Sequence, residues 1–146
     1  TTACAKELLD KAPEYDYIIT AEAKGIPLAH EMSRQSGKKY FVARKKPKLY
    51  MTGVFDVVVN SITTEGEQHL YLDTAEAEEM KGKKVIIVDD VISTGESLKA
   101  VQNLVEKAGV ILAGNLAILA EGEAADREDL IYLEKLPLFD AEGNIL

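Results

Sequence analysis

The chain has 146 residues, of which 47% are hydrophobic and 29% are charged, and its formal net charge is −8 at pH 7. This length suits a single domain with a hydrophobic core of its own, and the composition is typical of a globular protein. The negative charge argues against a general surface for nucleic acids or anionic membranes.

Apolar runs typical of strands alternate with segments typical of helices along the chain. We predict helices at residues 3–12, 26–36 and 97–107, and strands at 17–20, 40–43, 54–62, 68–72, 85–88 and 110–119. The two strands on either side of Gly66 should form a hairpin, and residues 121–129 a surface loop or short helix. This alternation predicts an α/β fold with a mainly parallel sheet and helices on both faces. Ligands of such sheets bind beyond the carboxyl ends of the strands.

The positive charge is concentrated in one segment. Residues 38–48 contain six of the 17 basic residues and no acidic one, which leaves 11 basic against 25 acidic residues elsewhere. This distribution favours a local site for a small polyphosphate over a polymer, although a solvated loop is the alternative. The six residues are Lys38, Lys39, Arg44, Lys45, Lys46 and Lys48.

Two acidic residues, Asp89 and Asp90, directly follow the strand expected at 85–88, and a hydroxyl-rich turn then leads into a helix. The free N–H groups and positive dipole end of such a helix suit a phosphate dianion, which Gly95 lets approach the backbone. Carboxylates repel phosphate but accept hydrogen bonds from a ribose diol. The candidate residues are Asp89, Asp90, Ser93, Thr94, Gly95, Glu96 and Ser97.

The stretch from Val85 to Leu98 resembles the signature of type I phosphoribosyltransferases: four apolar residues, two acidic, two apolar, then a Ser/Thr-Thr-Gly turn. The resemblance implies that Asp89 and Asp90 hold the ribose hydroxyls of phosphoribosyl pyrophosphate, and that residues 93–97 hold its 5-phosphate. Glu96 departs from the family, which usually has a second glycine there. The alternatives are a turn that only caps a helix, or the acidic pair of a receiver domain.

Two further segments resemble the adenine branch of that family. Glu22-Ala23-Lys24-Gly25 resembles its pyrophosphate loop, with lysine at a position that is often arginine. Residues 44–49 resemble an Arg-Lys-x-Gly-Lys-Leu stretch, with Pro47 in place of glycine. The resemblance implies that pyrophosphate is bound by Ala23, Lys24, Gly25, Arg44 and Lys48.

Residues 50–74 correspond to the family's flexible flap, a hairpin that closes over the reacting centre. Glu65 is our candidate acid/base, although it lies one place later than the family's glutamate and lacks the tyrosine that follows there. His69 is an alternative on the same hairpin, whereas His30 should be structural. Cys4, the only cysteine, excludes an internal disulfide and should be a core or interface residue.

The base site is the least defined part of the sequence. In the family an N-terminal hood precedes the helix expected at 3–12, and this chain has almost no residues there. Three alternatives follow: the hood lies outside this sequence, it is built from another segment, or the protein has no nucleobase site. Leu119 and Glu121, which follow the strand expected at 110–119, are the candidates for base contacts.

The resemblance, which spans residues 16–139, implies a purine-salvage enzyme that transfers the ribose 5-phosphate group to an adenine-like base and releases pyrophosphate. It also implies Mg²⁺, bound mainly through the substrate, and a homodimer. The alternatives are a non-catalytic regulatory protein that binds phosphoribosyl pyrophosphate, and a pyrimidine enzyme of the orotate type. No run approaches the ~20 apolar residues of a membrane span and no leader opens the chain, so we expect a cytoplasmic location.

Overall fold

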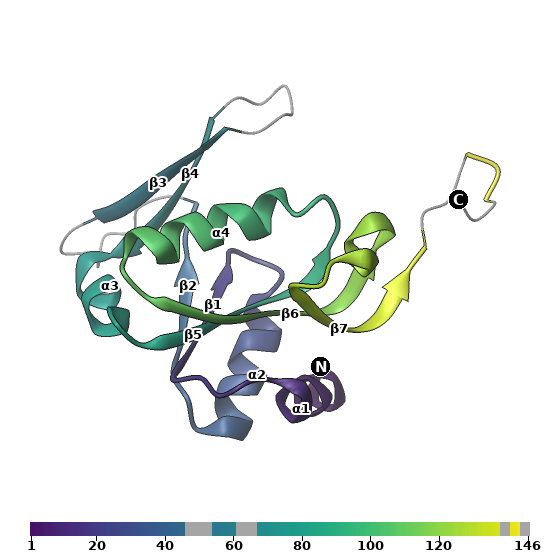
Figure 1. Cartoon of the computed structure of the whole chain (residues 1–146), viewed down its shortest axis with the longest axis horizontal. Coiled ribbons are helices and arrows are strands. Elements are labelled where there is room, and N and C mark those ends of the chain that lie inside the picture. Colours follow the sequence, from purple (N-terminus) through teal and green to yellow (C-terminus); the bar gives the residue numbers. More distant parts are fainter. Residues whose placement is uncertain (46–53, 61–66, 138–140, 144–146) are drawn as a thin grey trace.

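The computed structural model describes residues 1–45, 54–60, 67–137 and 141–143 (Figure 1). Its centre is a five-stranded sheet in the order β2-β1-β5-β6-β7, and every neighbouring pair is parallel. The strands of this sheet are β1 (Tyr17–Ala21), β2 (Tyr40–Ala43), β5 (Lys84–Ile92), β6 (Ile111–Glu121) and β7 (Leu130–Leu136).

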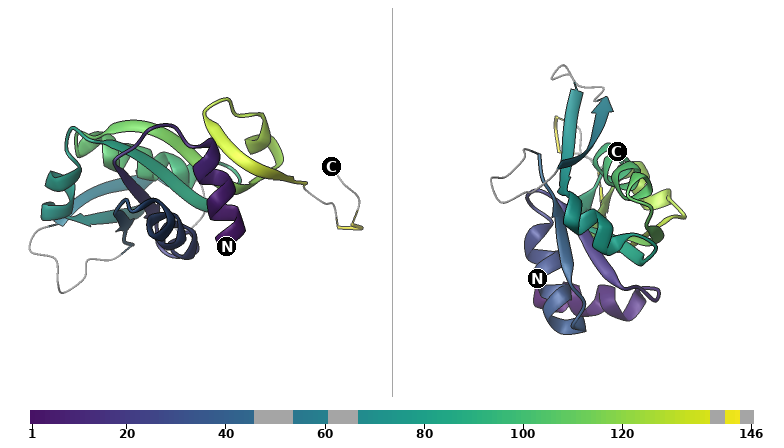
Figure 2. Two further views of the ribbon diagram at one scale, coloured as in Figure 1. Left: turned by 90° about the horizontal axis from the view of Figure 1, so that it is seen from below. Right: turned by 90° about the vertical axis from the view of Figure 1, so that its left-hand side faces the viewer.

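Helices cover both faces of the sheet (Figures 1 and 2). Helices α1 (Thr2–Lys11) and α2 (Ile26–Ser36) lie on one face, and α3 (Thr74–Met80) and α4 (Glu96–Lys107) pack into the core of the other. Successive strand residues point to opposite faces: Ile18 packs in the core beneath α1 and α2, and Ile19 in the core beneath α4. None of the described helices is long and apolar enough to cross a membrane.

A separate antiparallel hairpin consists of β3 (Val54–Asn60) and β4 (Glu67–Asp73). Its base is attached to the end of β2, because the Arg44 and Tyr71 backbones exchange hydrogen bonds of 2.9 and 2.7 Å. In Figure 1 the hairpin extends past α4. The two strands of the expected hairpin are confirmed, and its turn at 61–66 lies outside the described residues.

The parallel sheet with helices on both faces is confirmed, but several expected boundaries are wrong. Asp89 and Asp90 lie within β5, not after it, because parallel pairing with β6 continues through Ile92 and Ala120. Strand β6 extends to Glu121 for the same reason, since Glu121 pairs with Leu136 of β7. The sequence analysis did not predict α3 or β7, and residues 122–126 form the short 3₁₀ helix η1 (Gly122–Asp126).

Candidate functional site

A cavity of about 410 Å³ lies at the carboxyl ends of the central strands. Its walls come from the loop after β1, the segment after β2, the last part of β5, the first turns of α4 and one residue of the hairpin. These are Ala21, Glu22, Ala23, Lys24, Lys45, Leu70, Asp89, Asp90, Ser97 and Ala100. Three of the segments that the sequence analysis selected therefore meet in one place.

Two helices begin beside this cavity. Gly25 precedes α2 and Gly95 precedes α4, and neither helix receives a hydrogen bond from a capping side chain at that position. Gly95 has a φ of 84°, a left-handed conformation that favours glycine. The Thr94 hydroxyl accepts a long hydrogen bond, 3.4 Å, from the Glu96 N–H group. The first turn of α4 thus offers backbone donors and a positive dipole end to an anion.

The acidic pair, Asp89 and Asp90, lines the same cavity. The Oδ1 atom of Asp89 accepts a hydrogen bond of 2.8 Å from the Asp90 N–H group, and Asp90 Oδ1 accepts one of 2.8 Å from Val91. Burial and a side-chain hydrogen bond with Asp90 raise the pKa of Asp89 to about 7, against an opposing effect of the Lys24 charge. The pair can accept hydrogen bonds from a neutral diol, and its own repulsion disfavours two full charges.

The loop at residues 22–25 packs tightly against β5. A β-carbon on Gly25 would overlap the Thr20 hydroxyl and would lie 3.1 Å from Asp89 Oδ1, so the chain needs glycine here for close approach. The Glu22 N–H group donates a 2.9 Å hydrogen bond to the Ala43 carbonyl, and the Glu22–Ala23 peptide bond is cis. The loop is therefore held between the ends of β2 and β5, with the exposed residues Ala23 and Lys24 at the cavity.

Glu22 links this loop to the basic segment. Its Oε1 atom lies 3.6 Å from the Arg44 guanidinium, and its Oε2 atom accepts a 3.0 Å hydrogen bond from the Lys45 backbone N–H group. The Arg44 Nε atom is buried and has no hydrogen-bond partner among the described residues. Lys24 and Lys45 both line the cavity and supply two positive charges to it.

A family model describes the same region of the chain. The model of the phosphoribosyl transferase domain matches residues 2–135. The chain belongs to this family. The signature from Val85 to Leu98 predicted this family, and the match confirms that prediction. The type I phosphoribosyltransferase fold is confirmed by the solved structures described below.

Two curated relatives of this phosphoribosyl transferase domain are named hypoxanthine/guanine phosphoribosyltransferase. The protein of Methanococcus voltae is 38% identical over 112 residues, which cover 77% of this chain and 56% of the relative. That of Methanocella paludicola is 34% identical over 133 residues, covering 90% and 66%. The chain thus spans 56% and 66% of the length of these two relatives.

Solved structures that share the fold carry a different name. The adenine phosphoribosyltransferase of Thermoanaerobacter pseudethanolicus superposes with a TM-score of 0.77 at 24% identity, covering 92% of this chain and 80% of that one. The adenine phosphoribosyltransferase of Saccharomyces cerevisiae, solved with adenine, gives 0.74 at 23% identity, covering 90% and 76%. These two relatives and these two structures are therefore named for different bases.

The structure places other predicted site residues near the cavity but not along its walls. Ser93 and Thr94 are exposed, and Gly95 and Glu96 are half-buried, all on the turn into α4. Leu119 and Glu121 are half-buried in the last part of β6, outside the set that lines the cavity. The sequence analysis missed Lys45 as a cavity residue, although it lies in the basic segment from which Arg44 was chosen.

Several predictions fall elsewhere. Glu65 and Lys48 lie outside the described residues, and nothing is described of the His69 side chain. His30 is exposed on α2, where its ring meets the edge of Tyr40 at a centroid distance of 5.7 Å. Cys4 is half-buried in α1.

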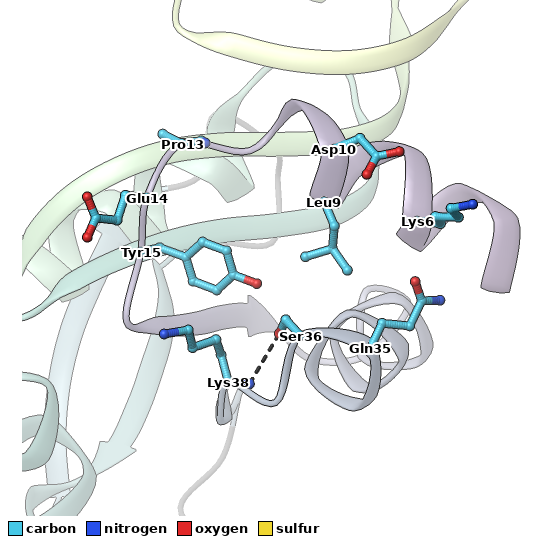
Figure 3. Close-up of a pocket in the computed structure, with 9 residues that line it drawn as sticks. All are labelled: Lys6, Leu9, Asp10, Pro13, Glu14, Tyr15, Gln35, Ser36 and Lys38. Atoms are coloured by element: carbon cyan, nitrogen blue, oxygen red, sulfur yellow. Dashed lines mark hydrogen bonds between the residues drawn. The ribbon is translucent and has the colours of Figure 1, made fainter.

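A second cavity, about 480 Å³, lies between α1 and α2 (Figure 3). Leu9 and Gln35 lie on its two sides, and Ser36 accepts a 3.2 Å hydrogen bond from the Lys38 N–H group. It lies away from the carboxyl ends of the strands, and of the residues that the sequence analysis selected only Lys38, in the basic segment, lines it.

The side chains that could coordinate a metal ion determine what kind of metal site this domain can form. In the part of the chain that the structure describes, no three or more His, Cys, Asp or Glu side chains cluster to hold a metal ion. Asp89 and Asp90 do supply carboxylate oxygens, which Mg²⁺ prefers, at the cavity. This set fits a magnesium ion that a bound substrate also coordinates.

Proposed function

We propose that this chain transfers the ribosyl 5-phosphate group of phosphoribosyl pyrophosphate to a purine base and releases pyrophosphate. The observation that carries this proposal is one cavity lined by Asp89 and Asp90 on β5, by Lys24 and Lys45, and by the first turn of α4. Each part of the substrate has a matching group in the protein. The carboxylates match the ribose diol, and the cations and the start of α4 match the phosphates.

The ribose and 5-phosphate would bind along β5 and the turn that follows it. Asp89 and Asp90 would accept hydrogen bonds from the 2- and 3-hydroxyls, which favours their ionised forms. The 5-phosphate would lie on the N–H groups at the start of α4, where hydroxyl side chains add donors. The residues of this half-site are Asp89, Asp90, Ser93, Thr94, Gly95, Glu96 and Ser97.

The pyrophosphate would lie against the loop at residues 22–25 and the segment after β2. Lys24 and Lys45 neutralise its charge, and the backbone of Ala23 and Gly25 provides further donors. We keep Arg44 and Lys48 in this set, since they lie on the same basic segment. Mg²⁺, when bound with the substrate, would offset the charge that develops on the leaving pyrophosphate.

In the reaction the bond between ribose C1 and the pyrophosphate oxygen breaks, and a bond from C1 to a base nitrogen forms. Positive charge develops on the ribose ring, so the protein acts mainly by positioning the groups and stabilising charge. The base loses the proton on its reacting nitrogen. Glu65, which lies between β3 and β4 in the sequence, remains our candidate for accepting that proton.

For the base, we propose hypoxanthine or guanine ahead of adenine. Relatives named for hypoxanthine and guanine are 34–38% identical to this chain, whereas the structures named for adenine are 23–24% identical. Leu119 and Glu121 at the end of β6 stay the candidates for base contacts. A homodimer, a cytoplasmic location and a single domain stay predictions.

The test is pyrophosphate release from phosphoribosyl pyrophosphate and magnesium in the presence of hypoxanthine, guanine, adenine, xanthine, orotate or uracil, with each nucleotide product identified by mass. We expect turnover with hypoxanthine or guanine. Turnover with adenine alone would restore the adenine prediction, and turnover with orotate alone would support the pyrimidine alternative. Binding of phosphoribosyl pyrophosphate without turnover for any base would contradict the enzymatic proposal and support the regulatory one.

A further inference from the structure

Arg127 packs onto the turn that precedes α4. A β-carbon on Gly95 would overlap the Nη1 atom of Arg127 and would lie 3.6 Å from its Cζ atom. The guanidinium thus occupies the space that a side chain at position 95 would take. The positive φ of Gly95 favours glycine at this position, and a side chain here would also have to displace the Arg127 guanidinium.

The Arg127 guanidinium is held in one orientation. Its Nε atom donates a 2.8 Å hydrogen bond to Asp129 Oδ1, and its Nη2 atom donates one of 2.7 Å to Asp129 Oδ2. This two-point contact is specific to arginine, because lysine has no planar fork. It leaves Nη1, the atom nearest Gly95, directed at the turn.

A polar network ties this arginine to the core. The Asn115 side chain, only 4% exposed on β6, donates a 3.0 Å hydrogen bond to the Asp129 carbonyl. Gln102 of α4 donates one of 3.2 Å to Asn115 Oδ1. The segment that carries Arg127 is therefore attached both to the sheet and to the helix that Gly95 precedes.

Neither Arg127 nor Gly95 is among the residues that line the cavity beside Asp89. Arg127 and Gly95 line a different cavity of about 420 Å³ along α4, which shares no residue with the set that includes Asp89 and Ser97. A direct contact between Arg127 and a bound phosphate therefore does not follow from the geometry. A contact through the Gly95 backbone does.

We propose that Arg127, oriented by Asp129, is a positioning residue for the 5-phosphate turn. This inference rests on the proposed function, because it assumes that the turn at Gly95 binds a phosphate. The guanidinium fixes the Gly95 backbone so that the N–H groups of α4 converge before the ligand arrives. It also places a positive charge close behind the phosphate dianion.

The test uses two anions that occupy different halves of the site. Ribose 5-phosphate reports on the turn at Gly95, and pyrophosphate reports on the loop with Lys24. We expect Arg127→Met to weaken ribose 5-phosphate binding roughly tenfold and to leave pyrophosphate binding within about twofold. Arg127→Lys, which keeps the charge without the fork, should give an intermediate loss, and in turnover KM for phosphoribosyl pyrophosphate should rise more than kcat falls.

Arg34→Met is the matched control, since Arg34 also pairs with a carboxylate, that of Glu31, but on the surface of α2. It should bind both anions as the wild type does. If Arg127→Met does not fold, Asp129→Asn takes its place, because it weakens the two hydrogen bonds that orient Arg127. Asp129→Asn should weaken ribose 5-phosphate binding by less than tenfold and leave pyrophosphate binding unchanged.

Three outcomes would overturn the inference. Unchanged ribose 5-phosphate binding in Arg127→Met would remove the positioning role while leaving the proposed function intact. Equal weakening of both anions would show a general structural role. If the wild type binds neither ribose 5-phosphate nor phosphoribosyl pyrophosphate, the proposed function itself fails, and this inference fails with it.

Discussion

Gly25 lies so close to Asp89 that a β-carbon on the glycine would be 3.1 Å from the Asp89 Oδ1 atom. This contact joins the loop proposed to bind pyrophosphate to the strand proposed to bind ribose. The two half-sites are therefore packed against one another directly. A substitution that displaces one half-site should therefore also displace the other and weaken binding there.

The first prediction concerns that contact. Gly25→Ala should lower the free energy of unfolding by about 1–3 kcal/mol, because the added methyl group overlaps the buried Thr20 hydroxyl. Phosphoribosyl pyrophosphate binding should also weaken, since the loop must move away from Asp89. Urea unfolding and calorimetry measure the two effects.

Thr20→Ala is the matched partner, because it removes the hydroxyl that the new methyl group would overlap. The double variant should recover part of the stability that Gly25→Ala loses, which a double-mutant cycle detects. Strict additivity of the two changes would show that the close approach of residues 20 and 25 is not the cause.

The second prediction follows from the raised pKa of Asp89. Its pKa in the folded protein, about 7, exceeds the ordinary 3.8, so ionisation of this side chain costs the folded state free energy. The favourable contribution of Asp89 is fully present below about pH 4 and is lost as the pH rises through 7. Asp89→Asn should therefore be more stable relative to the wild type at pH 8 than at pH 5.

Urea unfolding of both proteins at the two pH values measures this difference, and titrations elsewhere in the chain largely cancel. A stability difference that is the same at pH 5 and pH 8 would contradict the raised pKa. In the same variant phosphoribosyl pyrophosphate should bind more weakly at pH 8, because the amide oxygen is a weaker acceptor for the ribose hydroxyls than an ionised carboxylate.

The third prediction concerns the two lysines of the cavity. Lys24→Gln and Lys45→Gln should each weaken pyrophosphate binding roughly tenfold, because each removes a charge that faces the anion. The loss should shrink at high salt, where the exposed charges are screened. Lys6→Gln is the control, because Lys6 is also exposed but lines the cavity between α1 and α2. A similar loss in all three variants would indicate a general effect of net charge.

Much of the fold could be predicted where local patterns are strong. Helix α2 and strand β2 have the predicted bounds, since Pro27 and Gly37 mark the ends of the helix and β2 is a short apolar run. Strand β5 was predicted too short, because its last part carries Asp89 and Asp90, polar residues that break the apolar pattern. Only the pairing with β6, a long-range contact, shows that the strand continues.

The sequence motifs of the candidate site could be recognised, but the contacts between distant segments around it could not. The acidic pair and Lys24 were selected because each follows an apolar run in the sequence, and ligands of parallel sheets bind beyond the carboxyl ends of such strands. Arg127 was not found, since its contact with Gly95 joins segments that are distant in the sequence. Helix α3 was missed because its seven residues, three of them glutamate, give too short a window for a helical pattern.

The most direct test of the account is a calorimetric titration of phosphoribosyl pyrophosphate with magnesium into the wild type and into the double variant Asp89→Ala, Asp90→Ala. The account predicts saturable binding to the wild type and a loss of at least about 100-fold in the variant, because two charged acceptors for the ribose hydroxyls are removed. Equal affinity in the two proteins would contradict the assignment of this cavity as the ribose site.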